Sequence, residues 1–406
     1  MIAFDLETVW SGSYSVARMG LDRYVKDPRF QVTLVSLWSP DFQWVGKPSD
    51  LPVERISGQD LCAHNAEFDS VCARMAIARG QMPAFSPASW TCTADMSVWH
   101  QYPRSLSASF YEMFGAQLSK EARDQMAGID PEAIASNPAF REYALLDSKA
   151  CWELWNEFKD TWPEKEALLS QLTRKIASRG LPLDGPLCQK QIDALDDAMV
   201  EAGKILPWNG AAPITSPNAL KDACRLAGVD SPPSSNEDDP KLLRWKNKHP
   251  EQAAWLEAMT RYRKANKAEK QFRGLILRTR PDARVSTRLK YCGAPHTGRW
   301  SGSGGLNFQA IPRAQVEGTS MKKCLAAPAG KVLVTADLSQ IEPRILHWLA
   351  GDLEFLTLVG GGIDLYEAHG RASGLYKEEE PMKDFSDTAA EPSASSKWRT
   401  PSPAAP

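Results

Sequence analysis

Apolar and polar residues alternate at the beginning of the chain, where residues 2–8 read Ile-Ala-Phe-Asp-Leu-Glu-Thr. A period of two predicts a β-strand, because successive side chains of a strand point to opposite faces. Asp5 and Glu7 would share one face, and apolar side chains would cover the other. Two carboxylates about 7 Å apart on a strand are close enough to share one hard cation. A solvated strand face is the ordinary alternative for this pattern.

The rest of the pattern predicts further strands and then helices. Strands are predicted at 32–38, 42–45 and 61–63, with a turn at 39–41. Helical spacing of apolar residues predicts helices at 105–113, 138–160, 164–180, 186–205 and 250–279. The Pro-rich segments 83–104 and 207–240 are predicted to be loops, the first with a helix inside it.

Two further acidic positions accompany the predicted helices. Asn65 is a favourable N-cap residue, and Asp69 follows in the first turn, where the helix dipole favours an anion. Tyr143 and Asp147 are spaced i and i+4, so they lie on one face of a helix. Taken singly, these features are explained by a helix-start acid and by a surface hydrogen-bonded pair. Their occurrence in this order, after the acidic strand, favours one shared metal site.

The order Asp-x-Glu, Asn-x-x-x-Asp and Tyr-x-x-x-Asp resembles the three motifs of the DEDD 3′–5′ exonucleases that have Tyr in the third motif. This resemblance implies an α/β, ribonuclease-H-like exonuclease domain over residues 1–160. It also implies single-stranded DNA as a partner, with Asn65 as a DNA-binding residue. A ribonuclease-D-like enzyme that trims RNA is an alternative of the same class.

The resemblance also implies which residues hold metal and act in catalysis. Asp5, Glu7 and Asp147 would hold one Mg²⁺ or Mn²⁺ ion, and Asp5 and Asp69 would hold a second, partly through water. Tyr143 would orient the attacking water. Two such ions about 4 Å apart assist phosphodiester cleavage at the attacking and leaving oxygens. Four crowded acids predict a poorly ordered metal-free site and at least one raised carboxyl pKa.

Charge is unevenly distributed along the chain, although the net charge of all 406 residues is only −2. Residues 1–160 hold 14 Lys and Arg against 21 Asp and Glu, whereas residues 241–290 hold 15 against 4. A basic helix in the second segment fits a polyanionic ligand, and Lys264 and Lys267 are its candidate DNA-binding residues. A solvated helix face is the alternative.

Composition bounds the class of protein. A chain of 406 residues with 43% hydrophobic residues indicates two or three globular domains. No apolar run has transmembrane length, and the opening strand argues against a signal peptide. The eight cysteines include no C-x-x-C pair, which predicts free thiols in a reducing compartment. A cytoplasmic protein without a membrane partner is expected, in the host cytoplasm if the gene is phage-encoded.

Two later stretches carry a second set of motifs. Residues 290–313 are rich in glycine and contain Arg299 and Arg313, which are suited to binding phosphate. A glycine-rich hairpin is the alternative. Residues 331–337 predict a buried strand that ends at Asp337, and a helix follows, with Pro343 tolerated in its first turn.

These stretches resemble family A DNA polymerases of the phage type, and the resemblance covers about residues 1–376. The first matches the Thr-Gly-Arg and Gln-Asn-Ile-Pro region, and the second matches motif A, Asp-Tyr-Ser-Gln-Ile-Glu. Asp337 would be a metal aspartate, and Glu342 would exclude ribonucleotides. The implied primer–template contacts are Arg299, Gln309 and Arg313, and the implied nucleotide contacts are Asp337, Gln340 and Glu342. Departures from the family pattern occur at Ala310, Leu338 and Pro343.

The resemblance predicts a linker and mainly helical thumb over 161–289, a partial α+β palm over 290–376, and a disordered or aberrant tail over 377–406. No Arg-x-x-x-Lys helix and no His-Asp-Glu turn follow Asp337. A truncated or split DNA polymerase is therefore expected, with an active exonuclease and without polymerisation. The alternative is a DNA-binding subunit that synthesises DNA only with a second chain carrying the fingers and the rest of the palm.

Overall fold

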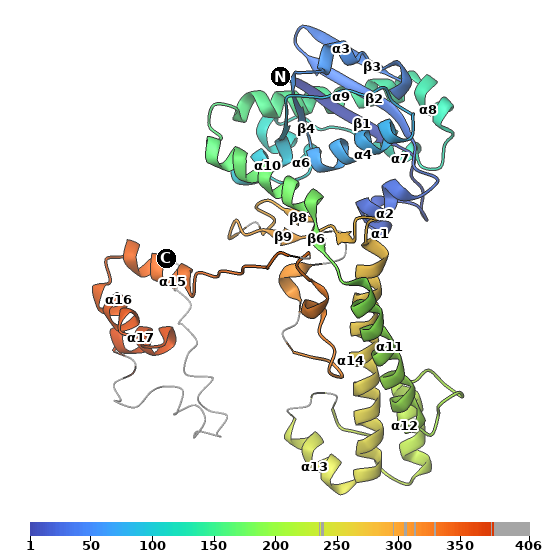
Figure 1. Ribbon diagram of the computed structural model, residues 1–406, viewed down its shortest axis with the longest axis vertical. Coiled ribbons are helices and arrows are strands. Elements are labelled where there is room, and N and C mark those ends of the chain that lie inside the picture. Colours follow the sequence, from blue (N-terminus) through green and yellow to red (C-terminus); the bar gives the residue numbers. More distant parts are fainter. Residues whose placement is uncertain are drawn as a thin grey trace. The chain divides into compact units, whose positions relative to one another are not determined.

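The computed structural model describes residues 1–376 except 235, 237–238, 295, 304–306, 312–313, 329 and 375. The predicted tail therefore lies outside the described residues. The chain divides into two compact units, Met1–Lys331 and Val332–Pro406. Figure 1 shows the first unit as an α/β part followed by long helices, and the second as a group of short helices.

A five-stranded sheet forms the centre of the α/β part. Its strands are β1 (Ile2–Thr8), β2 (Val32–Ser39), β3 (Phe42–Gly46), β4 (Asp60–Ala63) and β5 (Ser89–Cys92). Their order in the sheet is β3-β2-β1-β4-β5. β1, β2 and β3 pair antiparallel, whereas β4 runs parallel to β1 and to β5. The first four strands confirm the strands predicted at 2–8, 32–38, 42–45 and 61–63.

Helices cover both faces of this sheet. The longest is α9 (Pro138–Phe158), which packs on β1 and β2. On the other face, α2 and α4 contribute to the core that contains Phe4 and Leu6 of β1. The helices of this part are α1 (Val16–Met19), α2 (Leu21–Lys26), η1 (Pro48–Asp50), α3 (Val53–Ile56), α4 (Ala66–Ala78), α5 (Thr93–Trp99), α6 (Leu106–Phe114), α7 (Glu121–Gln125) and α8 (Pro131–Ser136), with α9 as above.

Long helices form the rest of the first unit. They are α10 (Glu164–Arg179), α11 (Gly185–Lys204), α12 (Pro217–Leu226), α13 (Pro240–Lys248) and α14 (Pro250–Arg278). α11 and α14 lie side by side (Figure 1) and bury Ile192, Leu195 and Phe272 between them. Full burial of one such side chain contributes about 2 kcal/mol, so this pair has a core of its own.

Short elements connect the long helices. They are β6 (Leu181–Pro182), β7 (Arg284–Val285), β8 (Leu289–Lys290), β9 (Ser301–Gly302), η2 (Phe308–Ala310) and η3 (Met321–Cys324). Gly180 ends α10 with a φ of 69°, and a Cβ there would lie 2.5 Å from the carbonyl oxygen of Val285. Glycine is therefore required where α10 turns into β6, which confirms the predicted end of this helix.

Three details of the predicted secondary structure are wrong. The segment predicted as a loop with a helix contains β5, which adds to the sheet edge by pairing with β4. The segment predicted as loop-rich contains α12, begun by the N-cap of Ser216. The apolar pattern of α10 does not mark its buried face, since Leu168 and Leu172 are 56% and 46% exposed whereas Ser170 is buried. Pairing with β4 decided only the first of these cases.

The second unit consists of α15 (Ile341–Leu349), α16 (Leu353–Gly360) and α17 (Leu365–Ala372). Phe355, Val359 and Ala368 form its core. The buried strand predicted to end at Asp337 is wrong, because residues 331–338 have no regular structure and are exposed. A strand needs a hydrogen-bonded partner, and no strand of the described residues pairs with this segment. The helix predicted after it is present as α15.

Candidate functional site

The two acids of β1 lie on the face of the sheet that α9 covers. Ala3 shares this face and packs against Cys151 of α9, whereas Phe4 belongs to the core on the opposite face. Alternation along the strand therefore aims Asp5 and Glu7 at α9. Of the described residues, Asp5, Glu7 and Asp147 each offer a ligand atom within 4.8 Å of the others. The structure thus brings together three predicted metal ligands that are far apart in sequence.

Asp69 approaches the same place from α4. Asp69 is 1% exposed, and the backbone N–H of Leu6 in β1 donates to the Asp69 carboxylate. The charges of Asp69, Glu7 and Asp147 all raise the pKa of Asp5, so the four carboxyls share one electrostatic environment. Asp69 is not among the three residues whose ligand atoms lie within 4.8 Å of one another.

Asn65 differs from its predicted role at the start of α4. The residue has a left-handed backbone, with φ 76°, and its side chain makes no capping hydrogen bond. An N-cap hydrogen bond requires an extended backbone at that position, so the predicted cap is wrong. Asn65 is exposed at the turn between β4 and α4.

Burial raises the pKa values of all four acids, and repulsion from neighbouring carboxylates adds to this effect at Asp5, Glu7 and Asp69. Desolvation is the largest cause in each case. The pKa of Glu7 rises to about 8, with the charge of Asp147 as the next cause, and that of Asp147 rises to about 6. The pKa values of Asp5 and Asp69 rise well above their ordinary range. The prediction of at least one raised carboxyl pKa is confirmed.

Two oxygens of this cluster suit a cation. Within the described residues, Asp5 Oδ2 and Asp69 Oδ1 are buried without a hydrogen-bond partner. A buried carboxylate oxygen without a donor is unfavourable unless a cation or a proton compensates it. The donor set contains only carboxylate oxygens, which are the ligands that Mg²⁺ and Mn²⁺ prefer. The residues present therefore fit a divalent metal ion.

Tyr143 lies one helical turn before Asp147 on α9. Its hydroxyl donates a hydrogen bond to the Asp147 carboxylate, which lowers the pKa of that acid against the larger effect of burial. Burial and the charges of Asp147 and Glu7 raise the pKa of Tyr143 itself above its ordinary value. Tyr143 is therefore protonated at neutral pH and can donate hydrogen bonds beside the acids.

Two cations near the acids were not among the predicted site residues. The charge of Arg123, in α7, lowers the pKa values of Glu7 and Asp147, and Lys120 acts on Asp147 as well. They lie in the segment between α6 and α8, where no periodic pattern or motif distinguishes them. They could offset the charge of a phosphate group that approaches the cluster.

A basic groove of about 560 Å³ runs along α14. Lys267, Arg263 and Lys270 line it from the helix, and Asn307 and Ile311 line it from the connecting segment. The groove therefore joins the basic helix to the end of the glycine-rich motif stretch. Lys264 lines a neighbouring hollow of about 430 Å³, together with Lys246 and Arg261.

The remaining predicted contact residues of the polymerase-like motifs are exposed where the structure describes them. Arg299 is exposed between β8 and β9, and Gln309 is exposed in η2. Neither residue lines the groove on α14. Arg313 lies outside the described residues. Asp337, Gln340 and Glu342 belong to the second unit and are exposed there.

The later part of the chain is similar to a known protein family. Residues 218–384 match the family model described as DNA polymerase family A. This part of the chain is therefore similar to family A DNA polymerases, the family that the motif stretches at 290–313 and 331–351 resemble.

Two curated relatives agree with the family match. A DNA polymerase of Bacillus phage SP02 is 22% identical over 90% of this chain and 64% of the relative. A DNA polymerase I of Lactococcus lactis subsp. lactis is 31% identical over 29% of this chain and 14% of the relative. The chain thus spans less than two thirds of the length of both relatives.

A solved structure has a similar fold. It is described as the POL domain of Pol1 from M. smegmatis in complex with DNA primer-template and dNTP. The TM-score is 0.54 at 18% identity, over 90% of this chain and 62% of that chain.

The described helices include none whose length and hydropathy would allow it to span a membrane.

Proposed function

We propose that the protein is a family A DNA polymerase of the phage type that acts in DNA replication and has a metal-dependent 3′–5′ exonuclease site. The convergence of Asp5, Glu7 and Asp147, with Asp69 beside them, carries the exonuclease part of this proposal. The family match over 218–384 carries the polymerase part. The α/β architecture of this part, with α9 covering the acids of β1, supports the proposal of a ribonuclease-H-like exonuclease domain.

The acids and Tyr143 would have different roles in hydrolysis. Asp5, Glu7 and Asp147 would hold one divalent cation, and Asp5 and Asp69 would hold a second. Bound there, Mg²⁺ or Mn²⁺ neutralises charge at the attacking water and at the leaving 3′ oxygen. Asp147 holds the Tyr143 hydroxyl, which can orient the water that attacks the terminal phosphodiester.

Incubation of the chain with a 5′-labelled primer–template, Mg²⁺ and dNTPs tests the proposed function. We expect the primer to shorten from its 3′ end and not to extend, because residues 1–406 supply only one candidate polymerase aspartate, Asp337, and no His-Asp-Glu turn. Single-stranded RNA of the same sequence serves as the control. Faster digestion of the RNA than of the DNA would instead favour an RNA-trimming enzyme.

A second chain that completes the palm is the alternative function, and one observation favours it. Residues 331–338 are exposed, although their apolar sequence predicts a buried strand, and Val332 and Val334 are 82% and 86% exposed. A strand from a polypeptide that carries the His-Asp-Glu turn could pair with this segment. Primer extension that appears only when such a polypeptide is added would support this alternative.

The groove on α14 is the proposed contact for primer–template DNA. Replacing Lys267 by alanine removes one cation from the groove, so we expect the slope of log K against log[salt] to fall by about 1. Affinity should fall about equally for different DNA sequences. Lys221→Ala, at an exposed position of α12 outside the groove lining, should leave the slope unchanged. Equal slopes for wild type and Lys267→Ala, measured by fluorescence anisotropy, would contradict this assignment.

A further inference from the structure

Arg288 connects the polymerase-like part of the chain to the acidic site. Its guanidinium is 9% exposed and lies between two carboxylates of the α/β part. Nη1 donates to Glu67 Oε1 at 2.5 Å, while Nη2 and Nε donate to the two oxygens of Asp22 at 2.5 and 3.1 Å. A guanidinium suits this arrangement, because its planar fork can bind one carboxylate with two hydrogen bonds and still reach a second.

The two partners of Arg288 belong to α4, which carries Asp69, and to α2, which is attached to the end of β1. Glu67 is in the first turn of α4, two residues before Asp69. Asp22 is in α2, which is fixed to the end of β1 directly after Glu7. The link from α2 to β1 is made by Tyr24, whose hydroxyl donates to the Val9 carbonyl oxygen and lies 2.7 Å from the hydroxyl oxygen of Thr8. Arg288 therefore bridges the end of β1 and the beginning of α4.

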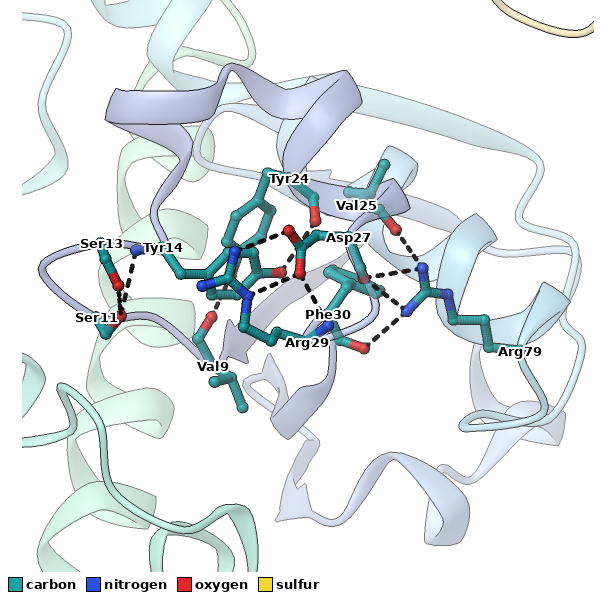
Figure 2. Close-up of polar contacts among 10 residues, drawn as sticks. All are labelled: Val9, Ser11, Ser13, Tyr14, Tyr24, Val25, Asp27, Arg29, Phe30 and Arg79. Atoms are coloured by element: carbon teal, nitrogen blue, oxygen red, sulfur yellow. Dashed lines mark hydrogen bonds and ion pairs between the residues drawn. The ribbon is translucent and has the colours of Figure 1, made fainter.

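Figure 2 shows how firmly the α2 side of this bridge is held. The rings of Tyr14 and Tyr24 stack with their centroids 4.6 Å apart, and the Tyr14 hydroxyl donates to the Tyr24 carbonyl oxygen. Arg79, at the end of α4, donates to the carbonyl oxygens of Val25, Asp27 and Phe30. α2 and α4 are thus joined by Arg79 at one end and by Arg288 at the other.

A second contact from the same segment reaches the turn before α4. The carbonyl oxygen of Tyr291 accepts from the guanidinium of Arg104. The carbonyl oxygen of Arg104 in turn lies 2.8 Å from Nε2 of His64, and Thr93 Oγ1 lies 3.0 Å from Nδ1. Burial lowers the pKa of His64 to about 4, so its ring is neutral at pH 7. Since a carbonyl can only accept, Nε2 carries the proton, and residues 64–67 are held from both ends.

We propose that Arg288 is a positioning residue of the nuclease site: through Glu67 it fixes the first turn of α4, and with it Asp69, relative to the acids of β1. This inference rests on the proposed nuclease function. It assigns to the segment 286–291 a role in metal binding at a site that this segment does not itself contact. Residues that orient metal ligands typically change metal affinity or activity by about 10- to 100-fold when they are removed.

Replacement of Arg288 by methionine in the full chain tests the proposal. We expect about 10-fold weaker Mn²⁺ binding by calorimetry and about 10-fold slower shortening of a 5′-labelled single-stranded DNA. Arg288→Lys should recover part of both, because it restores the charge but not the fork. Glu67→Gln should match Arg288→Met, and the double variant should be no worse than either single variant.

Two further variants test the bridge. Asp22→Asn weakens the half that ties Arg288 to α2 and the end of β1, so it should also weaken Mn²⁺ binding, but by less than Arg288→Met because the Arg288–Glu67 contact remains. Arg29→Met removes an exposed arginine that binds Asp27 in the same segment (Figure 2) and should leave both readouts unchanged.

A lower thermal stability of Arg288→Met with unchanged Mn²⁺ affinity and rate would overturn the proposal. If the wild-type chain binds Mn²⁺ but does not shorten DNA, the proposed nuclease function fails. In that case, the Mn²⁺ affinities of the wild-type and Arg288→Met proteins, measured by calorimetry, still test whether Arg288 positions the metal-binding acids.

Discussion

Replacing Asp5 by asparagine is expected to lower the rate of 3′–5′ hydrolysis by at least about a thousand-fold. The charges of all three other carboxyls raise the pKa of Asp5, and Asp5 would bind both cations in the proposed arrangement. Asparagine keeps the size of the side chain but removes the charge and one anionic oxygen. The measurement is the initial rate of mononucleotide release from a single-stranded DNA at saturating Mg²⁺.

The control for this prediction is Asp41→Asn, at an exposed position in the turn between β2 and β3. It should hydrolyse DNA at the wild-type rate. The Asp5→Asn protein should still bind primer–template DNA, because the groove on α14 is made by other residues. An Asp5→Asn protein that releases nucleotides as fast as wild type would remove the acidic cluster from the mechanism.

Without metal, the protein is expected to lose stability as the pH rises from about 5 to about 8. Glu7 and Asp147 have raised pKa values of about 8 and about 6 in the folded chain, so the native state binds more protons than the unfolded state in this range. Stability falls with pH wherever the native state holds the extra protons, and the contribution of these two groups levels off only once the pH exceeds the pKa of Glu7, which is about 8. Denaturant unfolding in EDTA at several pH values measures the change.

Two additions test the cause of this pH dependence. Mg²⁺ should restore stability at pH 8 and have little effect at pH 5, where protons compete for the carboxylates. Glu7→Gln should stabilise the metal-free protein at pH 8 by on the order of 2 kcal/mol, because it removes a carboxylate that is unfavourable to bury and that Asp147 repels. Glu112→Gln, at an exposed position of α6, should not. A flat stability profile in EDTA between pH 5 and 8 would contradict the crowded-acid interpretation.

The acids of the site were predictable because each lies in a segment with a clear local period. Alternation places Asp5 and Glu7 on one face of β1, and helical spacing places Tyr143 and Asp147 on one face of α9. Both periods are properties of the backbone and need no tertiary information. The resemblance to known motifs then joined segments that local periodicity alone cannot connect.

Other features could not be predicted from local sequence patterns. β5 is a strand because β4 offers it a parallel edge, and its four residues lie in a Pro-rich segment. Residues 331–338 have a strand-like sequence but no partner within the described residues, and they are exposed without regular structure. In both cases the pairing partner decides, because a strand is stable only when its hydrogen bonds are made by another segment.

The sequence by itself determined which acids share a face, where the main helices begin and end, and which stretches carry polymerase motifs. The tertiary structure decided that Asp69 joins the acids of β1 and α9, that Lys267 faces Asn307 and Ile311 across a groove, and that Arg288 lies between Asp22 and Glu67. The physical reason is that a local period fixes the direction of a side chain relative to its own element. Which group it meets depends on how elements distant in sequence pack together.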